Sequence, residues 1–137
     1  MATLNPYLTF NGNCREAMNF YKDVLGGELD LMKAGDTPAA SQMPEKYHDQ
    51  ILHSTLKTEH FEIMATDMVS GGFNEGDTVQ LCLICKSEEE IYLLFDKLSA
   101  GGKVKQPLSE MFFGLIGNLT DKFGKNWLLE LNKPADQ

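Results

Sequence analysis

The stretch LNPYLTFNGNCREAMNFYKDVLGG at residues 4–27 has a counterpart, VQLCLICKSEEEIYLLFDKLSAGG, at residues 79–102, an offset of 75 residues. Each stretch opens with an extended apolar run, continues with apolar residues at helical spacing and stops at a pair of glycines. Sequence identity between the two stretches is weak, so the comparison rests on their shared order of elements. That order predicts an internal repeat in which each copy begins with a strand followed by a helix.

The helix of each copy has recognisable ends. Asn13-Cys-Arg-Glu16 and Ser87-Glu-Glu-Glu90 both fit the capping box, in which the first side chain accepts a hydrogen bond from the amide three residues on and the glutamate reaches back. The glycine pairs provide the stops. We therefore expect the two main helices over residues 13–25 and 87–100.

Further extended segments follow each helix, at residues 28–32, 51–56, 61–65, 103–105, 115–119 and 127–131. Each half of the chain is thus one helix and about four strands, a βαβββ module, whose sheet would have one bare face. Two modules can share that face. The sequence therefore predicts an α+β fold in which two βαβββ modules form a curved mixed sheet around a cleft, with the helices outside.

This organisation predicts one domain over residues 1–137, made of module 1 at about 4–67 and module 2 at about 78–132. Two long polar stretches, residues 34–49 and 69–77, contain glycine, and the first also contains proline. Loops of this length in a small domain are often mobile flaps or walls of a site, although they can also be plain connections.

The charge balance excludes one class of partner. The chain carries 20 Asp and Glu against 12 Lys and Arg, a formal net charge of −8 at pH 7, whereas a nucleic-acid-binding protein needs a basic surface. No apolar run approaches the ~20 residues that a membrane span requires. The first residues also lack the basic and apolar regions of a signal peptide. We expect a cytoplasmic protein without nucleic-acid or membrane partners.

Two of the three cysteines, Cys82 and Cys85, form a Cys-x-x-Cys sequence inside the extended segment 79–85. A separation of three residues in a strand points the two thiols to opposite faces. This geometry excludes a redox pair or a zinc knuckle. We expect both to act as small apolar core residues.

Five stretches carry a family resemblance: NPYLTFNGNC at 5–14, FYKDVLGG at 20–27, ILH at 51–53, IMATD at 63–67 and TDKFGKNW at 120–127. Together they resemble the PhnB-like branch of the vicinal oxygen chelate superfamily, which is also labelled a 3-demethylubiquinone methyltransferase-like domain. That superfamily includes glyoxalase I, extradiol dioxygenases, and bleomycin and fosfomycin resistance proteins. The resemblance covers nearly the whole chain and implies paired βαβββ modules and a homodimer.

Metal-dependent members of this superfamily use four ligands, usually His or Glu, one each from the first and fourth strands of each module. By the resemblance these positions fall on Asn5, Met64 (within one residue), Gln80 and Leu128. Amides are weak neutral ligands, a thioether suits copper(I), and leucine has no donor atom. We therefore expect no metal and no other cofactor.

Two residues are candidates for catalysis. Alternation along 51–56 places His53 on one face with Ile51 and Thr55, where a neutral imidazole could act as general base or as a donor to substrate. A hydrogen-bonded histidine on a half-buried strand is the more common situation. Glu130 shares a strand face with Leu128 and is the carboxylate nearest to the missing ligand, although an exposed glutamate near a strand end is ordinary.

Other polar residues have simpler interpretations. His48 and His60 lie in loop or turn contexts without a ligand-spaced partner and are expected to be solvated. Asp67 closes the fourth strand of module 1, where it can cap amides of the loop that follows.

The expected ligand-binding set combines four aromatic side chains with polar residues and one leucine. Its members are Tyr7, Phe112, Phe113 and Trp127 together with Asn5, His53, Gln80 and Leu128. Apolar walls with a few polar groups describe a small-molecule pocket. Each aromatic residue taken singly fits ordinary core packing equally well.

The residues and the resemblance together leave three functions to consider. The first is a small-molecule-binding protein of the glyoxalase/bleomycin resistance type that lacks the usual metal ligands and holds a planar or hydrophobic ligand. The alternative is a glyoxalase-like lyase, isomerase or dioxygenase acting on a small oxygenated substrate. Methyl transfer rests only on the family label, because no glycine-rich loop after a strand indicates a nucleotide-type cofactor site.

Overall fold

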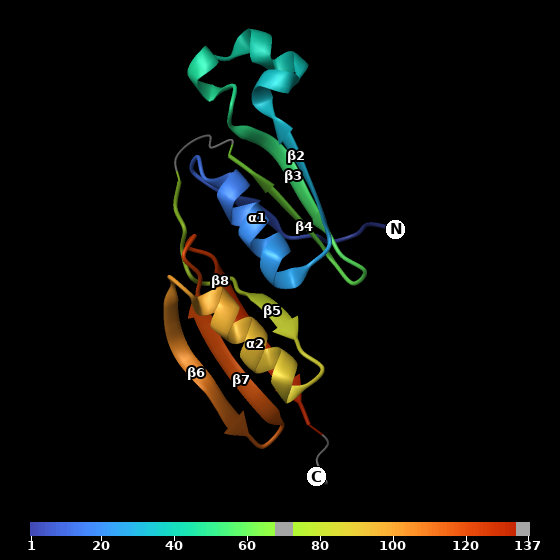
Figure 1. Ribbon diagram of the computed structural model, residues 1–137, viewed down its shortest axis with the longest axis vertical. Coiled ribbons are helices and arrows are strands. Elements are labelled where there is room, and N and C mark those ends of the chain that lie inside the picture. The colour runs from blue at the N-terminus through green and yellow to red at the C-terminus, as the bar shows by residue number, and fades with distance from the viewer. Residues whose placement is uncertain (68–72, 134–137) are drawn as a thin grey trace. The chain divides into compact units, whose positions relative to one another are not determined.

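The computed structural model describes residues 1–67 and 73–133 and divides into two compact units, Met1–Phe73 and Asn74–Gln137. The first part of the predicted loop at 69–77 lies outside the described residues. In each unit one helix lies across one face of a four-stranded mixed sheet (Figure 1). The α+β class and the two βαβββ modules are thus confirmed. No helix in the described part of the chain is long and apolar enough to cross a membrane.

Unit 1 contains the elements β1 (Tyr7–Thr9), α1 (Cys14–Leu25), β2 (Glu28–Lys33), β3 (Ile51–Lys57) and β4 (Glu62–Thr66). Its sheet has the order β1-β4-β3-β2, with β1 parallel to β4 and the other pairs antiparallel. The long stretch between β2 and β3 forms three short 3₁₀ helices, Ala34–Asp36, Pro38–Gln42 and Glu45–Tyr47.

His48 forms hydrogen bonds within the segment between β2 and β3. Its Nε2 lies 2.9 Å from the carbonyl oxygen of Ala40 and 3.2 Å from that of Met43, and the residue is half-buried. His48 is therefore part of the local hydrogen bonding and is not solvated as the loop context suggests.

Unit 2 repeats the same order with β5 (Leu81–Ile84), α2 (Glu88–Ser99), β6 (Lys103–Met111), β7 (Gly114–Thr120) and β8 (Asn126–Asn132). Its sheet has the order β5-β8-β7-β6, and β5 is parallel to β8. The β6 strand is longer than the predicted segment because it continues alongside β7 to their shared turn.

The parallel pairing of the first and last strands is equivalent in the two modules. Residues 7–9 pair in parallel with residues 64–66, and residues 82–84 pair in parallel with residues 128–130. The first strands are related by the 75-residue offset that the sequence comparison uses. The two modules therefore share register as well as element order.

The glycine pairs after the helices have the same role in both units. A side chain on Gly27, which has a φ of +96°, would place its Cβ 2.5 Å from the carbonyl oxygen of Lys57. A Cβ on Gly102 would lie 2.3 Å from the carbonyl oxygen of Thr120. The second glycine of each pair thus allows the chain that leaves the helix to lie against the third strand of its own sheet.

The capping of α1 differs from the prediction. Asn13 makes no side-chain cap hydrogen bond. Instead Asp67, which is 4% exposed, accepts hydrogen bonds from the amides of Cys14 (2.9 Å) and Gly12 (3.0 Å) at Oδ1 and from the amide of Ile51 (2.9 Å) at Oδ2. A carboxylate supplied from the end of β4 therefore replaces the local cap, and it joins three segments that are distant in sequence.

The capping box of α2 forms. Ser87 Oγ accepts from the amide of Glu90 at 3.1 Å, and Glu90 Oε1 accepts from the amide of Lys86 at 2.7 Å. The glutamate thus reaches back one residue further than the standard box.

In both units the helix covers one sheet face and leaves the other without a helix. A Cβ on Gly117 of β7 would lie 3.0 Å from Phe95 Cε2 of α2, which identifies the helix-covered face of unit 2. Because neighbouring residues of a strand point to opposite faces, Ile116 and Asn118 lie on the other face. We call the face turned away from the helix the open face of each unit.

Candidate functional site

The open face of unit 1 carries a row of paired residues in which Tyr7 of β1 pairs with Met64 of β4, and Met64 pairs with Thr55 of β3. His53 lies two residues before Thr55 on the same face and pairs with Met32 of β2. The half-buried His53 is therefore flanked by two methionines and two hydroxyl-bearing side chains. We call these five residues the His53 cluster.

Each imidazole nitrogen of His53 has one hydroxyl nearby. Tyr7 Oη lies 3.5 Å from Nδ1, and Thr55 Oγ1 lies 3.4 Å from Nε2. The rings of Tyr7 and His53 are tilted by 35° with centroids 5.9 Å apart. One nitrogen of a neutral imidazole donates and the other accepts, so the two hydroxyls can hold either tautomer.

Ile51 is not on the face of His53, contrary to the alternation argument. Met32 pairs with His53 and Lys33 pairs with Ile51, so Leu52 is the extra residue of a β-bulge. Ile51 is 1% exposed, whereas His53 is half-buried. The bulge turns Ile51 into the core while His53 and Thr55 stay together.

Acidic residues lie beside the His53 cluster. Asp30 of β2 pairs with Thr55 and is exposed, and in the next row Lys57 pairs with both Glu28 and Glu62. Asn5, from the predicted ligand-binding set, is half-buried and precedes β1.

The open face of unit 2 has two rows. In one, Cys82 pairs with Leu128, which pairs with Asn118. In the other, Ile84 pairs with Glu130, which pairs with Ile116. Leu128 and Glu130 therefore share this face, while Gln80 is exposed and precedes β5.

The two thiols of the Cys-x-x-Cys sequence point in different directions, as predicted. Cys82 is exposed on the open face, and Cys85 is 4% exposed, so only Cys85 is a core residue. Partial burial raises the pKa of the Cys82 thiol, and the Glu130 carboxylate raises it further. Burial, together with smaller effects of Glu90 and Cys82, raises the pKa of Cys85 to about 11. Neither thiol is an activated nucleophile.

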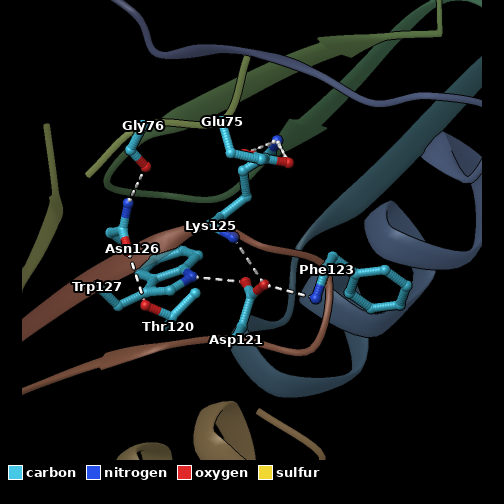
Figure 2. Close-up of polar contacts among 8 residues, drawn as sticks. All are labelled: Glu75, Gly76, Thr120, Asp121, Phe123, Lys125, Asn126 and Trp127. Atoms are coloured by element: carbon cyan, nitrogen blue, oxygen red, sulfur yellow. Dashed lines mark hydrogen bonds and ion pairs between the residues drawn. The ribbon is translucent and has the colours of Figure 1, made fainter. Parts of the chain in front are cut away.

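Trp127 lies in the core of unit 2. It precedes Leu128 on β8 and so points to the helix-covered face, where it is 1% exposed. Its indole Nε1 donates to Asp121 Oδ2 at 2.8 Å. Figure 2 shows this contact together with the ion pair of Lys125 and Glu75. Trp127, predicted as a ligand-binding residue, is therefore a buried, hydrogen-bonded side chain of the core of unit 2.

The two phenylalanines of the predicted set lie at the turn between β6 and β7. Phe112 is 96% exposed, and its ring meets that of Phe113 edge to face with centroids 5.2 Å apart. Since Trp127 is in the core, unit 2 does not bring its three predicted aromatic side chains together.

The positions that the resemblance assigns to metal ligands carry Asn5, Met64, Gln80 and Leu128. Met64 faces Tyr7 in unit 1, and Leu128 faces Cys82 in unit 2. The thioether of Met64 is a soft ligand and the alkyl chain of Leu128 has no donor atom, so neither side chain suits a hard divalent cation. Across residues 1–67 and 73–133, no three His, Cys, Asp or Glu side chains are grouped so that they could hold a metal.

Met32 and Asn118 are among the residues of the open faces that sequence reasoning missed. Met32 enters the His53 cluster through strand pairing, which a single sequence does not specify. Asn118 could have been found, because it alternates with buried residues along residues 115–119 and so had to face away from the helix.

Comparison with known proteins identifies relatives along the whole chain. The family model described as 3-demethylubiquinone-9 3-methyltransferase matches residues 2–129. Protein YjdN of Escherichia coli K12 is 32% identical over 95% of each chain. The crystal structure of protein PA1353 from Pseudomonas aeruginosa is 34% identical, covers 98% of this chain and 100% of its own, and superposes with a TM-score of 0.87. The PhnB protein from Bacillus cereus is 28% identical over 95% of this chain and 99% of its own, with a TM-score of 0.78.

The fold extends to more distant proteins. The fosfomycin resistance protein FosX from Listeria monocytogenes, in a structure complexed with Mn(II), has a TM-score of 0.65 at 12% identity, covering 97% of this chain and 94% of its own. At this identity the likeness concerns the fold alone.

Proposed function

The chain belongs to the family described as 3-demethylubiquinone-9 3-methyltransferase, the PhnB-like branch of the vicinal oxygen chelate superfamily, and from this premise we propose that it binds a small planar or hydrophobic molecule on the open face of unit 1. The observation that carries the proposal is the His53 cluster. It combines an imidazole, two hydroxyls and two thioethers on the sheet face of unit 1 that is turned away from α1.

The side chains of the His53 cluster have properties that suit the binding of a small ligand. The contacts of His53 at 3.4 and 3.5 Å are long for hydrogen bonds. A polar atom of a ligand can therefore replace either hydroxyl with little loss of hydrogen-bond energy. Tyr7 is 51% exposed and Met32 is 45% exposed. Tyrosine presents an apolar ring with a polar tip, and methionine adapts its shape to varied ligands. Both suit a planar or hydrophobic ligand.

Binding is favoured over metal-assisted catalysis because of the residue types present. A glyoxalase-like lyase, isomerase or dioxygenase would need a ligand set for its metal, and Met64 and Leu128 do not provide one. His53 could still act as a general base without a metal, so turnover should be tested beside binding. Methyl transfer is tested in the same way, by adding S-adenosylmethionine to the panel.

The experiment is a thermal-shift screen with small aromatic and keto compounds. A ligand at 100 times its Kd stabilises the folded state by about 2.7 kcal/mol, which for a chain of this size raises Tm by about 10 °C. We expect His53→Gln and Tyr7→Phe to reduce the shift of any hit. His60→Gln, in the exposed β3–β4 turn, is the matched control and should retain it. A hit whose shift survives His53→Gln would contradict the location of the site.

Two further properties stay proposals. We propose a homodimer, on the family resemblance, and a cytoplasmic location. Light scattering tests the first: a mass near the 15.3 kDa of one chain at micromolar concentration would contradict it, because obligate interfaces of about 2,000 Å² or more persist there.

A further inference from the structure

One row of paired residues crosses all four strands on the open face of unit 1. Asp30 of β2 pairs with Thr55 of β3. Thr55 also pairs with Met64 of β4, which in turn pairs with Tyr7 of β1. Directly paired residues point to the same face of a sheet, and strands are about 4.8 Å apart, so the row spans about 14 Å. We call these four residues the Asp30 row.

Both ends of the Asp30 row are accessible. Asp30 is exposed, and Tyr7 is 51% exposed. Thr55 and Met64, between them, are half-buried and form the floor of the row. Thr55 Oγ1 lies 3.4 Å from His53 Nε2, so the row runs directly beside the imidazole. A ligand held by His53 therefore also meets the side chains of the row.

The negative charge of Asp30 has no partner on this face. Within residues 1–67 and 73–133 no ion pair involves Asp30. In the sheet of unit 1 no lysine or arginine pairs with a residue of the row or with His53. Lys57, in the next row, lies between Glu28 and Glu62, so two carboxylates offset its charge. A cation beside Asp30 is therefore attracted, and an anion is repelled.

The other end of the row suits an aromatic ring. Tyrosine packs against a second ring edge to face or with an offset, and a methionine thioether makes favourable contacts with aromatic groups. Met64 lies two strands from Asp30, a separation of about 10 Å between backbones. A ring that rests on Met64 beside Tyr7 can therefore carry an ammonium group to Asp30 on a short aliphatic arm.

We propose that the ligand of this site is a protonated arylalkylamine that lies along the Asp30 row, with its ammonium group beside Asp30 and its ring on Met64 against Tyr7. The inference rests on the proposed function, because it uses the same site. It adds the charge of the ligand and its direction across the sheet, and it makes Asp30 the residue that selects for charge.

The test compares 2-phenylethylammonium with 3-phenylpropionate, which have the same ring, similar arms and opposite charges. Each is titrated into full-length protein labelled with ¹³C at the methionine methyl groups. We expect the ammonium compound to shift the methyl signals of Met64 and Met32, and the carboxylate to leave them unchanged. Met111 of unit 2 is 51% exposed and serves as the internal control, since its signal should not move.

Substitutions of Asp30 test the selection for charge. Asp30→Asn should weaken binding of the ammonium compound about two- to fivefold, the contribution of an exposed charge pair. Asp30→Lys should reverse the preference, so that 3-phenylpropionate binds more tightly. Asp23→Asn is the control, because Asp23 is exposed on α1, which covers the other face of the same sheet. This variant should bind the ammonium compound as the unmodified protein does.

Failure of this inference is distinguishable from failure of the proposed function. If both compounds shift Met64 equally and His53→Gln abolishes both shifts, the site is supported and the selection for a cation is overturned. No shift of Met64 with the ammonium compound, or equal effects of Asp30→Asn and Asp23→Asn, also overturns the inference. In either case hits among uncharged compounds in the thermal-shift screen, and their loss in His53→Gln, still decide the proposed function.

Discussion

Asp121→Asn should strongly destabilise unit 2. Asp121 is 3% exposed, and its carboxylate accepts from the amides of Phe123 (2.8 Å) and Lys125 (3.0 Å) at Oδ1 and from Trp127 Nε1 (2.8 Å) at Oδ2 (Figure 2). Asparagine offers one acceptor oxygen in place of two. Its NH₂ group must face either the two amides or the indole N–H, so at least one buried donor then meets another donor.

The size of the expected stability loss follows from the less destabilising of the two orientations of the asparagine amide. If the asparagine oxygen keeps the two amides, the bond to Trp127 is lost and the other two no longer end on a charge. A hydrogen bond to a charged group contributes about 1.5–3 kcal/mol, and a buried donor left unsatisfied costs about 1–3 kcal/mol. We therefore expect a loss of about 2–4 kcal/mol, which lowers the urea midpoint by about 1–2 M at a typical slope for a small protein.

Trp127 is the only tryptophan of the chain, so its fluorescence reports on the environment in question. Urea unfolding followed by tryptophan emission gives the midpoint, and the emission spectrum of the folded variant shows whether the indole has lost its acceptor. Asp96→Asn, an identical change on the exposed side of α2, is the control and should shift the midpoint very little. A midpoint of Asp121→Asn within the error of that control would refute the reasoning.

Three further outcomes are expected. Gly114→Ala should prevent stable folding of unit 2, since the new Cβ would lie 1.9 Å from the carbonyl oxygen of Leu131 at a φ of +141°; a soluble variant with an unchanged urea midpoint would contradict this. In the folded protein a thiol reagent at pH 8 should modify the exposed Cys82, and the rate should increase as the pH rises toward the raised pKa of this thiol. The same reagent should modify Cys85 only after unfolding, because this thiol is buried and burial raises its pKa to about 11. Glu130→Gln should lower the pKa of Cys82 and accelerate its modification at pH 8, whereas an unchanged rate would show that the carboxylate does not act on the thiol.

Local pattern was enough to predict the elements of this fold. The apolar spacing after Asn13 and after Ser87, together with the glycine pairs, located each end of both helices to within one residue. The 75-residue offset correctly indicated a first strand before each helix, because alternation and helix stops depend only on neighbours in the sequence.

Features that depend on distant residues were not predictable in this way. The cap of α1 comes from Asp67, which directly follows β4, so the local capping signal at Asn13 gave the correct helix start for a different physical reason. The bulge at Leu52 appears only when β3 is paired with β2, and it separates Ile51 from His53.

One site assignment could have been improved from the sequence alone. Trp127 and Leu128 are consecutive on one strand and so cannot both line the same face. Leu128 and Glu130 do share the open face, which alternation indicates, whereas the indole of Trp127 needs the buried acceptor that Asp121 provides. Strand parity was thus a better guide than aromatic composition to which side chains share the open face.

The contacts of Glu75 and Gly76 bear on where the chain can be cut for separate expression of its halves. Lys125 Nζ lies 2.9 Å from Glu75 Oε2, and Asn126 Nδ2 donates to the carbonyl oxygen of Gly76 at 3.2 Å. A fragment that starts at residue 78, just before the first strand of the second repeat, would lack Glu75 and Gly76, the partners of Lys125 and Asn126. Removing one member of a largely buried ion pair is strongly destabilising. A fragment that starts at Asn74 keeps both contacts, so residues that look like a tether in the sequence belong to the smallest piece that can be expected to fold.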